Sequence, residues 1–248
     1  MSTTIIITGA SGMLGRALHR LLLHESNYSY NVIGLGFSRL EVNYHEHFAD
    51  SSEQNSKVHL HKLNLLDYEE TSAFLNLHKP DIIVHCAAER YPDAFEKNIK
   101  ASLKLNVDAT MHLATECLRL CDENKANQRT KPYLIYISTS YVFDGGVPSQ
   151  VYPPYKPDSK ANPINSYGQS KWDGESAIRD VLNKAGKSGQ GIIVRVPLLY
   201  GEDCIDLNES PGEFIDLFDV IKSCFVSYFV ILSSGNDEGA PTTRSKQP

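Results

Sequence analysis

Short apolar runs alternate with longer segments of helical periodicity along most of the chain. The apolar runs predict strands at residues 5–7, 31–36, 57–63, 81–86, 133–138 and 192–196. Between them, helices are expected at residues 13–24, 67–77, 94–121 and 166–182, and loops at 122–131 and 147–163. Alternating helices and strands, with the strands almost wholly apolar, are typical of a parallel sheet covered by helices on both faces. The pattern therefore predicts an α/β fold built on a doubly wound parallel sheet.

Three glycines at spacing three follow the first predicted strand, in the sequence Thr8-Gly9-Ala10-Ser11-Gly12-Met13-Leu14-Gly15. A strand that turns sharply into a helix leaves backbone N–H groups pointing outward, and these groups and the helix dipole favour a pyrophosphate. Gly9 permits the turn, Gly12 the approach of phosphate, and Gly15 the packing of helix on strand. A glycine-rich turn that binds nothing is the alternative. The position of the motif in an alternating strand–helix chain favours a Rossmann-like dinucleotide site.

The residues after the second predicted strand bear on which dinucleotide is bound. A carboxylate there would bind a ribose 2′-hydroxyl and favour NAD. Here the strand ends Gly36-Phe37-Ser38-Arg39, and no carboxylate occurs before Glu41. Ser38 and Arg39 instead suit a 2′-phosphate, so NADP is the predicted cofactor. The alternative for Arg39 is a solvated loop residue.

Tyr167 and Lys171 stand four residues apart, on one face of a predicted helix. A nearby ammonium lowers the pKa of a phenol, which makes Tyr167 a candidate proton donor or acceptor. The lysine is also placed to hold a nicotinamide ribose, and Thr139, just past the fifth strand, offers a hydroxyl to a substrate carbonyl. A surface tyrosine beside a solvated lysine is the alternative. The preceding glycine turn and the Ser/Thr-rich strand end favour the chemical interpretation.

Composition excludes several other classes of function. The 248 residues carry a net charge of −6, so no broad basic field attracts nucleic acid or an anionic membrane. Met1 leads directly into the first strand and no signal peptide is expected. Five cysteines without regular spacing indicate a reduced, cytoplasmic protein. Cys117 and Cys121 on one helix are predicted to be buried thiols, and no metal site is predicted.

The motifs together resemble those of the extended short-chain dehydrogenases/reductases. They are the glycine turn, the sequence Ser138-Thr139-Ser140-Tyr141-Val142-Phe143-Asp144-Gly145, and the Tyr167-x-x-x-Lys171 pair. Within that superfamily the chain resembles the dTDP-4-dehydrorhamnose reductase branch, and more closely the regulatory beta subunits of methionine adenosyltransferase. Residues 85–93, 105–109, 134–138, 172–175 and 195–202 carry this closer resemblance, which spans roughly residues 4–202.

The resemblance implies roles for particular residues. NADP would be held by Gly9, Ser11, Gly12, Met13, Leu14, Gly15, Phe37, Ser38, Arg39, Asp67, Ala87, Ala88, Tyr167 and Lys171. Asp67 would lie near the adenine, and Ala87 and Ala88 would line the path of the cofactor. Thr139, Tyr167 and Lys171 occupy the catalytic positions of the reductases. Ser140 stands where both groups usually carry an aspartate, so turnover does not follow from the resemblance.

Two functions remain open on this basis. The first, preferred, is a non-catalytic, NADP-binding regulator that associates with a methionine adenosyltransferase catalytic subunit and modulates S-adenosylmethionine synthesis. The second is an NADPH-dependent oxidoreductase acting on a dTDP-4-keto sugar. Neither implies a nucleic-acid or membrane partner.

The resemblance also predicts a division of the chain. Residues 1–202 are expected to form the NADP-binding Rossmann-like domain, and residues 203–248 a divergent segment in which the usual C-terminal substrate domain is truncated. Residues 223–232 are apolar but too short to span a bilayer. Residues 233–248 are polar and rich in Gly, Pro, Ser and Thr, and they are expected to be disordered.

Overall fold

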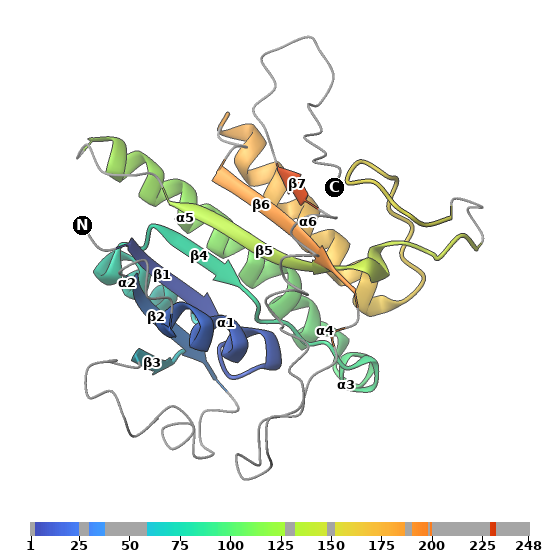
Figure 1. The fold of residues 1–248 in the computed structure, drawn as a ribbon, viewed down its shortest axis with the longest axis horizontal. Helices are drawn as coiled ribbons and strands as arrows, with labels where there is room; N and C mark the ends of the chain where they lie inside the picture. The colour runs from blue at the N-terminus through green and yellow to red at the C-terminus, as the bar shows by residue number, and fades with distance from the viewer. Residues whose placement is uncertain are drawn as a thin grey trace.

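The computed structural model describes residues 3–24, 30–37, 59–126, 132–147, 152–186, 190–197, 199 and 229–231. These residues form a seven-stranded sheet in the order β3-β2-β1-β4-β5-β6-β7, in which all neighbours except β6 and β7 are parallel (Figure 1). The strands are β1 (Thr3–Thr8), β2 (Tyr30–Gly36), β3 (His59–Lys62), β4 (Ile82–His85), β5 (Tyr133–Thr139), β6 (Gly191–Val196) and β7 (Phe229–Ile231). The helices are α1 (Met13–His24), α2 (Tyr68–His78), α3 (Pro92–Lys97), α4 (Ile99–Leu103), α5 (Ala109–Ala126) and α6 (Ser166–Lys184), with a π-helix η1 (Lys104–Asp108) and a 3₁₀ helix η2 (Ser140–Val142).

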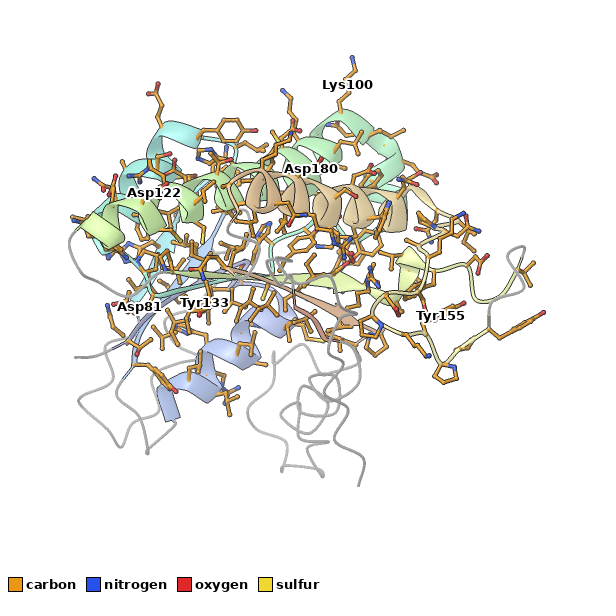
Figure 2. The ribbon with its side chains drawn as sticks, turned by 90° about the horizontal axis from the view of Figure 1, so that it is seen from above. Asp81, Lys100, Asp122, Tyr133, Tyr155 and Asp180 are labelled. Atoms are coloured by element: carbon orange, nitrogen blue, oxygen red, sulfur yellow. The ribbon has the colours of Figure 1, made fainter. Side chains whose placement is uncertain are left out.

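The sheet separates two hydrophobic cores. Successive side chains of a strand point to opposite faces, so Ile6 of β1 enters one core while Ile5 and Ile7 enter the other. The larger core lies under α2, α5 and α6, and the smaller one lies under α1 with Leu18 and Leu22 (Figure 2). Because each central strand is buried on both faces, its sequence reads as a continuous apolar run. The predicted doubly wound parallel sheet is confirmed.

The order of the strands fixes where a ligand would bind. Strand β1 pairs with β2 on one side and with β4 on the other, so the direction of winding reverses between β1 and β4. Doubly wound sheets bind ligands outside the carboxyl ends of the strands at this reversal. Thr8, the last residue of β1, lies opposite His85, the last residue of β4. The glycine turn and the residues after β4 therefore face the same crevice.

The long helix expected at residues 94–121 is interrupted. It is divided into α3, α4, η1 and α5, and Asn98 caps α4 by accepting a hydrogen bond from the Ala101 N–H at 3.3 Å. In η1 the wider turns bring the Asn106 side chain to the loop after β4, where it binds both backbone groups of Glu89. Helix α5 continues to Ala126, so the prediction of a loop beginning at residue 122 is also wrong. A single helical period does not reveal these breaks, because local capping and a long-range contact cause them.

The edge strand β7 was not expected from the sequence. Residues 229–231, within the apolar segment 223–232, pair antiparallel with β6, and Val230 lies opposite Ile193. The segment assigned to the divergent C-terminal part thus adds a strand to the sheet, while the division at residue 202 stays a prediction. No helix among the described residues is long and apolar enough to cross a membrane.

Cys117 and Cys121 are buried in α5, as predicted for thiols of the core. Each lies near the Pro132 carbonyl, with S···O distances of 3.6 and 3.7 Å respectively. Across the part of the chain that the structure describes, no three His, Cys, Asp or Glu side chains are grouped so that they could hold a metal ion.

Candidate functional site

The glycine turn joins β1 to α1 in close contact with the end of β4. Gly9 has a φ of 69°, in the left-handed region, and a Cβ on it would lie 2.6 Å from the backbone nitrogen of Ala87. A Cβ on Gly15 would overlap the Gly9 carbonyl and lie 2.8 Å from the Ala10 Cα. Both positions therefore require glycine, for the turn and for the packing of helix on strand, as the sequence predicts.

Gly12 differs from the other two glycines, because a Cβ on it would meet few atoms. Among the described residues outside its immediate chain neighbours, only the Gly9 oxygen would lie within 4 Å of a Cβ on Gly12, at 3.2 Å. The Gly12 N–H donates to that oxygen at 2.9 Å, and α1 begins at Met13. An open glycine directly before the first turn of a 12-residue helix leaves room and N–H donors for a pyrophosphate. The residues present therefore fit a dinucleotide, and Ser11, Met13 and Leu14 would meet it at the same turn.

The predicted adenosine end of the site is described in part. Phe37 follows β2 and is 49% exposed, while Ser38 and Arg39 lie outside the described residues. Asp67 is exposed and caps α2, where it accepts a hydrogen bond from the Glu70 N–H at 2.9 Å. This cap is a structural role that the carboxylate has in addition to the predicted contact with adenine.

Ala87 and Ala88 follow Cys86 just after the end of β4 and are half-buried. The Ala87 N–H donates to the Thr8 hydroxyl at 3.3 Å, which holds this segment beside the end of β1. With Gly9 packed on the Ala87 backbone, the turn and the residues after β4 form one wall. The small side chains of Ala87 and Ala88 leave space beside this wall, where they are predicted to line the path of a cofactor.

Thr139 and Tyr167 come from different elements that the fold brings together. Thr139 ends β5, and its hydroxyl oxygen accepts a hydrogen bond from the Tyr141 N–H at 3.2 Å, starting η2. Tyr167 lies in the first turn of α6, and its ring is 6.2 Å from that of Tyr141 in a T-shaped pair. A Cβ on Gly168 would overlap the Tyr141 carbonyl, so the start of α6 lies directly against η2. Ser140, exposed in η2, stands in the same corner.

The electrostatic surroundings of Tyr167 differ from those predicted. Its spacing from Lys171 suggests a lowered pKa, but burial raises the pKa of Tyr167 to about 12. Arg90 opposes that shift, whereas Tyr141 adds to it. Desolvation of the phenolate thus outweighs the nearby positive charge. The expectation is wrong in sign, and Tyr167 is held as a neutral phenol, the form that donates a proton.

Lys171 is buried beneath the site, only 2% exposed, one turn along α6 from Tyr167. Its Nζ lies over the Tyr136 ring, 4.0 Å from the centroid. Burial lowers the pKa of Lys171 to about 7, although Cys86 and Glu175 favour the charged form. The alternative of a solvated surface lysine is excluded.

A polar network that the sequence did not predict connects the glycine turn with α6. His85 bridges two hydroxyls, with Nδ1 2.7 Å from Thr8 Oγ1 and Nε2 2.9 Å from Thr110 Oγ1. Thr110 donates its own proton to the Asn106 carbonyl at 2.9 Å, so the His85 proton resides on Nε2. Asn106 in turn donates to Ser170 Oγ at 3.0 Å. The signal in the sequence that could have indicated this network is a single histidine, His85, at the end of an apolar strand.

A titration tests the neutral state of His85. Burial lowers the pKa of His85 to about 3, from 6.5, with Lys171 adding to the shift. Between these values the unfolded chain binds one proton more, so the free energy of unfolding rises with pH across this window. Relative to His85→Gln, the wild type should lose about 1.4 kcal/mol per pH unit as the pH falls. Urea unfolding at several pH values measures this slope, and parallel curves for the two proteins would contradict it.

Comparison with known proteins agrees with this architecture. The family described as RmlD substrate binding domain matches residues 3–210. Methionine adenosyltransferase 2 subunit beta of Xenopus tropicalis is 37% identical over 217 residues, which are 88% of this chain and 52% of that protein. The subunit from Rattus norvegicus is 35% identical over 201 residues, 81% of this chain and 48% of its own length. The chain thus spans about half the length of these curated relatives.

Solved structures give the same relationship. A dTDP-4-dehydrorhamnose reductase from Bacillus anthracis, in complex with NADP, superposes with a TM-score of 0.57 and 25% identity, covering 81% of this chain and 55% of the reductase. A hypothetical dTDP-4-dehydrorhamnose reductase from Sulfolobus tokodaii gives a TM-score of 0.54 and 30% identity, over 79% of this chain and 56% of that one. With the glycine turn, the parallel sheet and the match over residues 3–210, the chain belongs to the RmlD substrate binding domain family.

Proposed function

We propose that this protein is an NADP-binding regulatory subunit of a methionine adenosyltransferase, which modulates S-adenosylmethionine synthesis in the cytoplasm. The observation that carries the proposal is the 37% identity to methionine adenosyltransferase 2 subunit beta, which extends over 88% of the chain. The match covers 52% of the relative, so the proposal concerns about half of that protein. The partner would be the catalytic subunit implied by the name of the relative.

The residues proposed to hold NADP would gather at the carboxyl ends of β1 and β4. The turn at Gly9 and Gly12 and the start of α1 would bind the pyrophosphate. Ser38 and Arg39 would meet the 2′-phosphate, with Phe37 and Asp67 beside the adenosine. Ala87, Ala88, Tyr167 and Lys171 would border the nicotinamide half. When bound, NADP supplies a hydride acceptor, or a donor in its reduced form.

An NADPH-dependent reductase of a dTDP-4-keto sugar is the second candidate. It is favoured by Tyr167 and Lys171 one turn apart on α6, by Thr139 beside Tyr141, whose ring packs against Tyr167, and by the 25% identity to the NADP-bound dTDP-4-dehydrorhamnose reductase. In that reaction Tyr167 Oη would protonate the carbonyl oxygen while the carbonyl carbon receives hydride, and Thr139 would orient the carbonyl. The neutral phenol of Tyr167 has the proton that this step requires. Against it stands Ser140, where the resembling families carry an aspartate.

Co-purification with a methionine adenosyltransferase catalytic subunit tests the proposal. We expect the full chain to elute with that subunit in size-exclusion chromatography, more completely when NADP is present, and to change the rate of S-adenosylmethionine synthesis. Gly12→Asp is the matched variant, because its carboxylate would repel a pyrophosphate while its Cβ would require a shift of only a few tenths of an ångström from the Gly9 oxygen at 3.2 Å. This variant should lose the NADP dependence and keep the melting temperature of the unliganded chain.

The second candidate makes a different prediction for the same preparations. Absence of a complex, together with NADPH oxidation on a dTDP-4-keto sugar, would overturn the regulatory proposal in favour of a reductase. In that case Tyr167→Phe should abolish turnover and leave NADP binding largely intact. Turnover that survives this substitution would remove Tyr167 from the proton-donor role.

A further inference from the structure

The buried cation of Lys171 lies over the face of an aromatic ring. Its Nζ lies 4.0 Å from the centroid of the Tyr136 ring, and both side chains are almost wholly buried. Among the described residues no carboxylate forms an ion pair with Lys171. A cation over the face of a ring is attracted by the ring quadrupole, and the attraction is strongest where water is excluded. The ring of Tyr136 therefore offsets part of the cost of burying this charge.

The other groups around Lys171 are less suited to compensate its buried charge. Glu175, on the same helix, is bound by Arg195 at 2.7 and 2.8 Å and by Ser138 at 2.7 Å. His85 on β4 is neutral, and burial raises the pKa of the Cys86 thiol to about 12, so it is also neutral. On the same helix, Tyr167 is a neutral phenol. The nearest negative charge is thus already committed to a guanidinium.

The fold holds the Tyr136 ring in one place. The ring stands on the buried strand β5, and its hydroxyl lies 3.5 Å from the Lys171 carbonyl. A Cβ on Gly174 would lie 2.5 Å from that hydroxyl oxygen, so the absence of a side chain lets α6 rest on the end of the ring. The His85 ring packs at 5.6 Å between centroids. Contacts at several points prevent the ring from turning away from Lys171.

We infer that Tyr136 is the positioning residue for Lys171, its ring face fixing the ammonium at the carboxyl end of β5 where a nicotinamide ribose would lie. The part that concerns the ribose rests on the proposed binding of NADP. The part that concerns the ammonium depends only on the geometry of the two side chains. The role belongs to the aromatic face and not to the hydroxyl, so phenylalanine should replace tyrosine and a ring with a weakened quadrupole should not.

The decisive experiment changes the quadrupole and leaves the shape of the ring nearly unchanged. Phenylalanine, and phenylalanines with an increasing number of ring fluorines, are placed at position 136 of the full chain. The pKa of Lys171 is read by NMR of isotope-labelled lysine, and Lys171→Met identifies its signal. Tyr136→Phe should keep the value near about 7. The fluorinated series should lower it stepwise, by about 1 in total. A pKa that stays constant along the series would overturn the inference, whether or not NADP binds.

NADP titrations of the same variants separate this inference from the proposed function. Binding of an anionic ligand favours charged Lys171, so affinity should fall above the pKa of Lys171, and the midpoint of that fall should move to lower pH along the fluorinated series. If the wild type fails to bind NADP but the Lys171 pKa still falls stepwise along the fluorinated series, the proposed function is overturned and the positioning of the ammonium stands. NADP binding with one midpoint for all variants would contradict the positioning role.

Discussion

Replacing Lys171 by methionine should raise the free energy of unfolding at neutral pH, while NADP binding is lost. The lysine is 2% exposed, and burial lowers its pKa from 10.5 to about 7. Methionine has a similar length and no charge to desolvate, so it fills the same space at lower cost. The expected gain is on the order of a few kcal/mol. That is a large change for a fold whose total stability is about 5–15 kcal/mol.

The pH dependence of this gain identifies its cause. Between about 7 and 10.5 the unfolded chain holds one proton more on Lys171 than the folded chain does. The wild type therefore becomes more stable as the pH rises through this window, and the cost of the buried charge is fully present below about 7. The advantage of Lys171→Met should be greatest near neutrality and should shrink as the pH rises. Urea unfolding of both proteins at several pH values measures it.

Lys184→Met is the matched control, because Lys184 is exposed near the end of the same helix α6. It should change the free energy of unfolding by less than about 0.5 kcal/mol and leave NADP affinity unchanged. Destabilisation by Lys171→Met at neutral pH would show that the ring of Tyr136 and the nearby acid overcompensate burial. Unchanged NADP affinity of Lys171→Met would remove the lysine from the binding site.

If Lys171→Met stabilises the fold and abolishes NADP binding, the buried lysine is present for function and not for stability. Natural proteins accept local instability where a site needs a charged or strained group, and the remaining fold compensates for it. Here Lys171 lies one turn along α6 from Tyr167, whose ring packs against Tyr141 just after the end of β5. An aliphatic side chain would serve the core better. The buried charge is therefore best understood as a functional group, for a regulatory cofactor or for hydride chemistry.

The features that the sequence predicts well depend on neighbours close in the chain. The alternation that sends Ile6 to one core and Ile5 and Ile7 to the other is a property of any strand, and the strands were found within a few residues. The glycine turn could also be predicted, because the positive φ of Gly9 and the contact of Gly15 with Gly9 and Ala10 are local, although Gly9 also packs against Ala87. Residue spacing also placed Tyr167 and Lys171 on one helix, as the structure confirms.

The features that were missed depend on distant contacts and on burial. The π-helix η1 is associated with the bonds of Asn106 to Glu89 and Ser170, and β7 requires β6, more than 30 residues earlier in the chain. The sign of the Tyr167 pKa shift was missed because spacing reveals a neighbouring charge but not the loss of water. In each case the deciding partner is far away in the sequence.

Replacing Glu175 by glutamine should destabilise the fold by about 3–5 kcal/mol, because it leaves a buried guanidinium without its counter-ion. The carboxylate of Glu175 is fully buried and accepts two hydrogen bonds from Arg195, at 2.7 and 2.8 Å, one from Ser138 at 2.7 Å and one from Arg179 at 3.2 Å. Arg195 is only 4% exposed and also donates to the Pro157 carbonyl at 3.2 Å. Its guanidinium lies 5.0 Å from the Phe143 ring, which stacks on Tyr155. The ion pair thus ties α6, β6 and the loop before α6 together.

Chemical unfolding followed by circular dichroism measures the effect, with Glu123→Gln as the matched control. Glu123 pairs with Arg119 on the surface of α5, where about 40% of each side chain is exposed, and its loss should cost less than about 1 kcal/mol. The double variant Glu175→Leu, Arg195→Met removes the buried pair and leaves only Arg179, whose side chain is 23% exposed, so it should recover most of the stability lost in Glu175→Gln. Equal losses in Glu175→Gln and Glu123→Gln would contradict the assignment. A double variant less stable than Glu175→Gln would show that the pair stabilises the fold through its geometry, beyond the neutralisation of a buried charge.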